Sequence, residues 1–143
     1  MFRIVAATAA LGLTLGAALL GSTAKAAAAV PFPAVMTLAS AGTCAGEISA
    51  VALPGRGVAA IYLRGTFMTP VPQPACVATT TIAWRNLDSG TSGTAGADVT
   101  GSPGGRPGPI TGAVLPTGPG RVEAWISTVP LPHLPSMVSF TVG

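Results

Sequence analysis

Ionisable side chains are scarce in this chain: aspartate, glutamate, lysine and arginine make up 8% of its 143 residues, and there is one histidine. A catalytic site built from acids, bases and nucleophiles therefore has few groups to draw on. The sequence contains no phosphate-binding glycine loop and no metal-type cysteine and histidine spacing. The four acids lie in four separate segments, so no carboxylate pair is encoded by spacing. We predict no enzymatic activity, no catalytic residue, no cofactor and no metal.

The single histidine, His133, lies in the proline-rich run PLPHLP. A catalytic base needs a nucleophile or a substrate proton within hydrogen-bond reach, and the neighbouring sequence supplies none. We interpret His133 as an exposed turn residue. The alternative hypothesis is a small exported hydrolase, in which folding brings an acid close to His133.

Long apolar runs are absent except at the start of the chain. Arg3 precedes an apolar stretch over residues 4–21, and the small-residue site Ala-Lys-Ala follows at 24–26. This order is typical of a signal peptide, here predicted as a helix over residues 1–26, and it indicates a secreted or cell-envelope protein. The stretch is also about long enough to cross a membrane, so a signal-anchored ectodomain is the alternative. A membrane is a predicted partner only if this segment is uncleaved.

Positive charge is also scarce once this segment is set aside. In residues 27–143, five arginines are opposed by four acids, and no basic cluster stands out in the sequence. Proteins that bind nucleic acid neutralise phosphates with many lysines and arginines. We therefore predict no nucleic-acid partner.

Only two cysteines are present, Cys44 and Cys76. In an exported chain two cysteines predict one disulfide, because the compartment outside the cytoplasm permits oxidation. Closing a loop of this length is worth about 3 to 4 kcal/mol in the chain-entropy description.

Helical periodicity is absent after the signal segment, and alternating apolar residues take its place. In the central stretch CVATTTIAWRNL, β-branched and aromatic residues alternate with small and polar ones, which favours a strand that buries one side. Glycine and proline fall between such stretches, as turns require. Strands are predicted at 47–53, 58–64, 76–87, up to residue 99 after a hairpin, 110–115, 121–129 and 137–142, with a short edge strand at 35–38.

The stretches TTTIAWRNLDSG, GPGRVEAWIST and SMVSFTV resemble the middle and closing strands of immunoglobulin-like or fibronectin-like domains. The chain is similar to small exported actinobacterial proteins of that architecture, for which the resemblance implies no particular activity. The implied fold is all-β: a single antiparallel immunoglobulin-like β-sandwich of about seven strands over residues 46–143, after a flexible leader at 27–45. Because Trp84 follows the second cysteine, the disulfide is not expected to be the usual inter-sheet bridge of antibody domains.

In the immunoglobulin-like order the strand of Trp84 lies beside the strand of Trp125, and their outward residues become neighbours. Exposed tryptophan and arginine are frequent anchors of interfaces. The predicted binding surface, for an extracellular or envelope protein or a glycan, comprises Arg85, Arg121, Glu123 and Trp125. Trp84, by contrast, is predicted to be buried with Ile82, Ile126 and Phe140.

Overall fold

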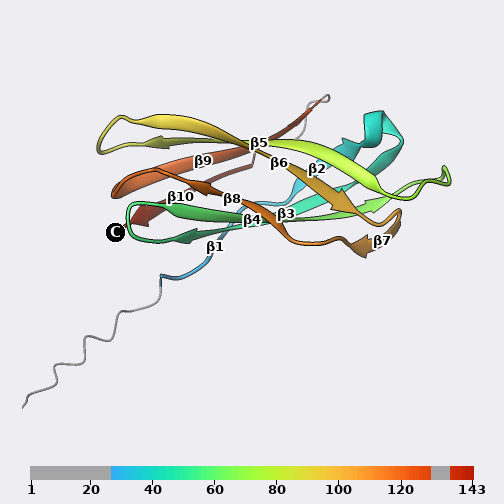
Figure 1. The fold of residues 1–143 in the computed structure, drawn as a ribbon, viewed down its shortest axis with the longest axis horizontal. Helices are drawn as coiled ribbons and strands as arrows, with labels where there is room; N and C mark the ends of the chain where they lie inside the picture. Colours follow the sequence, from blue (N-terminus) through green and yellow to red (C-terminus); the bar gives the residue numbers. More distant parts are fainter. Residues whose placement is uncertain (1–26, 130–135) are drawn as a thin grey trace, which may run out of the picture.

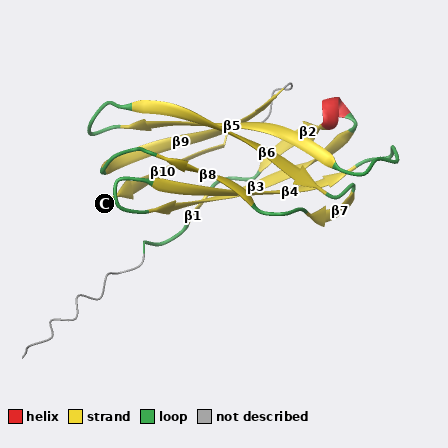
Figure 2. Cartoon of the chain, viewed as in Figure 1, coloured by secondary structure: helices red, strands yellow, loops and turns green. Residues whose placement is uncertain are grey.

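Two antiparallel β-sheets pack face to face in this protein (Figure 1). The computed structural model describes residues 27–129 and 136–143. Sheet A has the order β1-β3-β4-β7, with β2 paired to β3 and β8 paired to β4, and sheet B has the order β10-β9-β5-β6. The predicted single antiparallel immunoglobulin-like β-sandwich is confirmed as the fold class. In the described residues, Figure 2 shows one short helical turn, the 3-10 turn Ser40–Gly42.

Within the described residues ten strands form the two sheets, against about seven predicted. Sheet A contains β1 (Val30–Pro31), β2 (Val35–Ala39), β3 (Cys44–Pro54), β4 (Ala59–Met68), β7 (Gly104–Pro107) and β8 (Thr111–Leu115). Sheet B contains β5 (Cys76–Asn86), β6 (Ser92–Gly101), β9 (Gly120–Val129) and β10 (Ser136–Val142). Each predicted strand has a counterpart in this set. The additional strands β1 and β7 are short and contain proline, so alternation in the sequence does not reveal them. The predicted signal segment, 1–26, lies outside the described residues.

The sandwich begins earlier in the chain than the predicted boundary at residue 46. Strands β1 and β2, which belong to the segment 27–45 predicted as a flexible leader, both pair with β3. Phe32 and Val35 from this segment are buried in the core. The prolines near β1 are compatible with pairing because β1 is an edge strand, where a missing amide donor is tolerated. The structure therefore corrects the prediction of a leader at 27–45.

A single apolar core fills the space between the sheets. Along β4 and β5 the buried and exposed residues alternate, as the period of two requires. Trp84 is 6% exposed, and Gly93 opposite it on β6 leaves room for its ring, because an added Cβ would come 2.8 Å from the indole. The prediction that Trp84 is buried with three other large side chains is confirmed by one cluster that contains Ile82, Trp84, Ile126 and Phe140.

A second aromatic, Phe67, fills the other end of the core. It extends inward from β4 and is 0% exposed. Its ring lies against three glycines, Gly46, Gly65 and Gly101, at each of which an added Cβ would come within 2.8 Å of the ring. Phe67 therefore occupies space that these glycines leave free on β3, β4 and β6.

The disulfide between Cys44 and Cys76 is present, as predicted. Both cysteines are buried and their Cα atoms are 6.0 Å apart. Cys44 begins β3 of sheet A and Cys76 begins β5 of sheet B, so the bridge joins the two sheets. It still differs from the usual bridge of antibody domains, because Trp84 lies beyond the second cysteine on the same strand, β5. Gln73, in the proline-rich connection, donates to Cys44 Sγ over 2.7 Å.

Asn86, at the end of β5, holds two loops together from a fully buried position. Its Nδ2 donates to the carbonyl oxygens of Thr117 and Pro119, each at 2.9 Å. Its Oδ1 accepts from the backbone amides of Asp88 and Ser89 at 2.9 and 3.0 Å. One side chain therefore fixes both the β5–β6 turn and the loop that leads into β9.

Candidate functional site

The side chains that could contact another molecule lie on the two outer faces of the sandwich. We define face A as the outward residues of β3, β4, β7 and β8 together with Arg56 and Ile110. Face B consists of the outward residues of β5, β6, β9 and β10 together with Asp88. Because each strand alternates, these faces contain the residues that the core excludes.

The four residues predicted as a binding surface lie on face B. Strand β5 pairs with β9 in a register that places Arg85 opposite Glu123 and Ala83 opposite Trp125, so the predicted neighbourhood of the two tryptophan strands is confirmed. On its other side Trp125 lies opposite Met137 of β10. Trp125 is half-buried, not fully exposed as predicted. That these residues bind a partner stays a prediction.

Arg121 is the most constrained of the four. Its Nε and Nη2 donate to Asp88 Oδ1 at 3.0 and 2.8 Å, and its backbone amide donates to Asp88 Oδ2 at 2.8 Å. These hydrogen bonds from Arg121 hold the pKa of the Asp88 carboxyl below its usual range, and the same contact raises the pKa of Arg121. Asp88 is not among the four predicted residues, yet it neutralises one of them.

Acids accompany the cations on face B. Glu123 lies across from Arg85 and Asp88 is bound to Arg121, while Asp98 of β6 accepts a hydrogen bond of 3.0 Å from Thr79. Three acids are therefore present for two arginines. Face B therefore carries no excess of positive charge for an anionic partner.

Apolar side chains protrude from both faces, from face B at Val77, Val129 and Met137, but on face A they border two hollows. Tyr62 of β4 lies opposite Val51 of β3 and Gly112 of β8. Two shallow hollows flank it, of about 120 and 300 Å³, and both are lined by Tyr62 and Ile110. Ile110 and Val114 are each 65% exposed. The result is an uneven apolar surface on a face that does not pack against any other part of the described protein.

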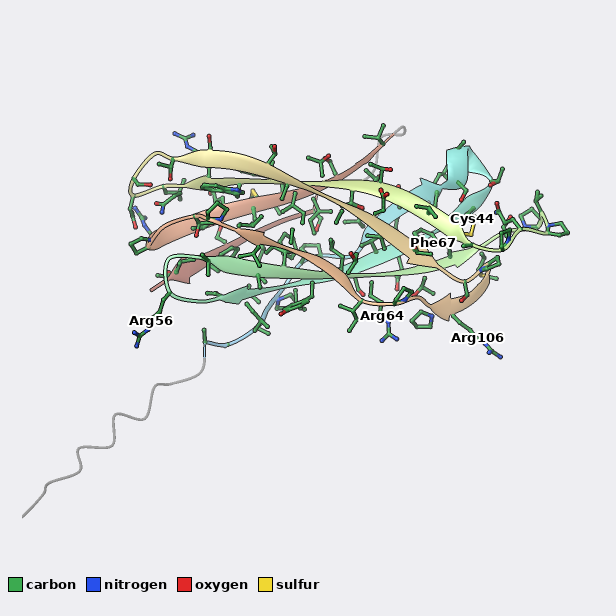
Figure 3. All side chains as sticks on the ribbon, viewed as in Figure 1. Cys44, Arg56, Arg64, Phe67 and Arg106 are labelled. Atoms are coloured by element: carbon green, nitrogen blue, oxygen red, sulfur yellow. A yellow bond between two sulfur atoms is a disulfide. The ribbon has the colours of Figure 1, made fainter. Side chains whose placement is uncertain are left out.

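Three arginines accompany this surface. In Figure 3, Arg56, Arg64 and Arg106 point away from the same side of the molecule, and they are spread from one end of it to the other. Arg64 Nε donates to the carbonyl oxygen of Gly108 at 2.8 Å, which directs the side chain along the face. Among residues 27–129 and 136–143, none of the three forms an ion pair with an acid. Glu47 on β3 is the one acid of this side within those residues, so positive charge is in excess by two.

Alternation over residues 58–64 puts Tyr62 and Arg64 on the same outward side of one strand, but it does not predict face A. Arg56 and Arg64 belong to one hairpin, whereas Arg106 comes from β7, and Ile110 joins Tyr62 only through the pairing of β4 with β8. The available signal was the outward side of residues 58–64, which combines an aromatic and a cation.

Other kinds of site find no support within the described ranges. No group of three His, Cys, Asp or Glu side chains that could hold a metal ion occurs there. In the same part of the chain no helix has the length and apolar character needed to span a membrane. His133 lies outside the described residues, so the hydrolase alternative stays a hypothesis.

Comparison of the chain with protein-family models, with curated proteins and with solved structures finds no match.

Proposed function

We propose that this protein is an exported, non-enzymatic β-sandwich that binds a component of the cell envelope or its surroundings through face A. One observation supports the proposal: the two hollows beside Tyr62 lie on the same face as arginines that lack ion-pair partners in the described residues. Exposed apolar surface on a small protein is a common mark of an interaction site. The buried disulfide agrees with an oxidising environment outside the cytoplasm.

Contact in the producing cell tests this proposal. A photoreactive residue is introduced in place of Val114 on face A, or in place of Met137 on face B. These positions are a matched pair, because both side chains are outward on a sheet and well exposed, and Met137 lies opposite Trp125 of the predicted surface. After irradiation the medium and envelope fractions are separated, and adducts are identified by mass spectrometry.

We expect adducts from position 114 and few from position 137, in the envelope or medium fraction. Adducts only from position 137 would instead support the predicted surface around Trp125 and exclude face A. Recovery of the protein only in the cytoplasm would contradict export.

A further inference from the structure

Face A combines protruding aliphatic groups with dispersed positive charge, and this combination points to one class of partner. We propose that face A docks onto a lipid surface that contains anionic headgroups. The inference rests on the proposed function, since it names what face A binds. It adds a route to the membrane that does not depend on residues 1–26, the one segment predicted from the sequence to contact a membrane.

The apolar part has the form expected of a shallow interfacial contact. Ile110 and Val114 are 65% exposed, Tyr62 is 43% exposed and Leu53 is 37% exposed, and all four project from the same sheet. Surfaces that lie in the headgroup region bury such side chains while their cations stay among the phosphates. Tyrosine also favours this region, because its ring is apolar and its hydroxyl is polar.

The spacing of the three arginines favours a flat anionic surface over a single small anion as the partner. Arg56, Arg64 and Arg106 are distributed along the whole side of the molecule in Figure 3, so one small anion could not contact all three. A plane of anionic headgroups could do so at once. The same three cations disfavour the pairing of face A with a second copy of this chain, because like charges would be brought together.

The polar groups of face A also disfavour a partner that is recognised through directed hydrogen bonds. Ser49 Oγ donates to the carbonyl oxygen of Arg64 at 3.3 Å, and Arg64 Nε is engaged by Gly108. The backbone of β4 is paired on both sides, by β3 and β8. A single sugar or an extended peptide would need free donors and acceptors in fixed positions. Face A offers mainly apolar area and charge, which suit a fluid lipid surface.

The test measures binding of the purified protein, with the N-terminus it carries in the producing cell, to vesicles of equal parts phosphatidylglycerol and phosphatidylcholine. Vesicles of phosphatidylcholine alone are the neutral reference. The charge variant is Arg56→Gln/Arg64→Gln/Arg106→Gln, and the apolar variant is Ile110→Ser/Val114→Ser. The face B controls are Arg85→Gln and Met137→Ser. Any contribution of residues 1–26 is common to all variants, so differences among them report on the faces.

We expect each arginine removed to weaken binding to the anionic vesicles about fivefold, so that the charge variant loses about a hundredfold. The apolar variant should lose about tenfold or more, and both controls should bind as the unaltered protein does. Raising the salt concentration should weaken binding by the unaltered protein more than by the charge variant. Thermal unfolding of every variant should be unchanged, since all these side chains are exposed.

Equal binding to neutral and anionic vesicles, or equal losses in the face A and face B variants, would overturn the lipid inference. The photoreactive residue at position 114 separates this failure from failure of the proposed function. A lipid adduct supports both proposals, whereas a polypeptide or glycan adduct overturns the lipid inference and leaves face A as the binding surface. The absence of adducts from position 114 overturns both.

Discussion

The two outer faces of this sandwich use similar residue types in opposite ways. On face B, Arg85 lies opposite Glu123 and Arg121 is held by Asp88, so the cations have acids of the same sheet beside them. On face A, Arg64 lies opposite Ser49, and none of Arg56, Arg64 and Arg106 forms an ion pair in the described residues. A surface ion pair such as Arg121–Asp88 contributes little to stability. The main difference between the faces is therefore their charge: acids balance the arginines of face B, whereas arginines exceed acids on face A.

Both faces lie on sheets that share one core. Truncation of the large aromatic residue beneath each sheet is the strongest test of this shared core. We expect Phe67→Ala, beneath sheet A, and Trp84→Ala, beneath sheet B, each to lower the free energy of unfolding by about 3 to 5 kcal/mol. Denaturant titration followed by far-UV circular dichroism measures the loss, with Val114→Ala as an exposed control. A second, separate transition in either variant would show that the sheets unfold independently.

The disulfide is the covalent link between the two sheets, and its removal tests how much this link contributes to the stability of the sandwich. Cys44→Ala/Cys76→Ala should lower the free energy of unfolding by about 3 to 4 kcal/mol, because the unfolded chain regains the entropy of an open loop. Circular dichroism of the variant should still show the β-sheet spectrum. Mass spectrometry of the unaltered protein should detect no free thiol, and detection of free thiols would contradict the bridge itself.

Asn86 supports the end of face B that carries Asp88, and replacing it should disturb this face and spare face A. Asn86→Ala deprives two carbonyl oxygens and two amides of their partner, at a cost of about 2 to 4 kcal/mol. Asn86→Asp is the sharper variant, since it keeps the acceptor but sets a buried carboxylate oxygen against the carbonyl oxygens of Thr117 and Pro119, and at neutral pH it should destabilise at least as much as Asn86→Ala. Thermal denaturation compares them. A cost for Asn86→Ala no larger than that of the exposed variant Thr91→Ala would show that these hydrogen bonds are not needed.

Releasing Arg121 should make face B more like face A. In Asp88→Asn the guanidinium loses its ion pair, and binding to the anionic vesicles should rise by about fivefold or less. Because the pKa of Asp88 is lowered in the folded protein, its stabilising effect is complete above the ordinary aspartate pKa of about 4 and is lost as the pH falls through the lowered value. The stability difference between the unaltered protein and Asp88→Asn should therefore be constant from about pH 5 to 8 and vanish in stronger acid. A difference that persists in strong acid would exclude the ion pair as its cause.

The smallest expected effect concerns the two tryptophans of sheet B. Single variants Trp84→Phe and Trp125→Phe leave one indole each, and iodide quenching reports its accessibility. The indole of Trp125 should be quenched more than that of Trp84, but less than a free indole, because Trp125 is half-buried. Greater quenching of Trp84 would show that the inward and outward residues of β5 and β9 are wrongly assigned, and the assignment of face B would then be wrong as well.

The sequence alone determined the local features of this protein. Alternation over 58–64, 76–87 and 121–129 predicted three strands and which side of each is buried, because a strand has a strict period of two. The same alternation predicted the inward position of Trp84. The pairing of the two cysteines was predicted because the chain offers no other partner for either of them.

Only the tertiary structure decided how these strands combine. Alternation shows which residues share one side of a strand, but it does not show which strands become neighbours, because that depends on pairing between segments far apart in the chain. The contact of Phe67 with glycines of three strands, the sheets joined by the disulfide and the edge pairing of residues before 46 all depend on such pairing. The same holds for the charges: five arginines and four acids nearly cancel in residues 27–143, and their separation into a balanced face B and a positive face A arises from the order of strands in the sheets.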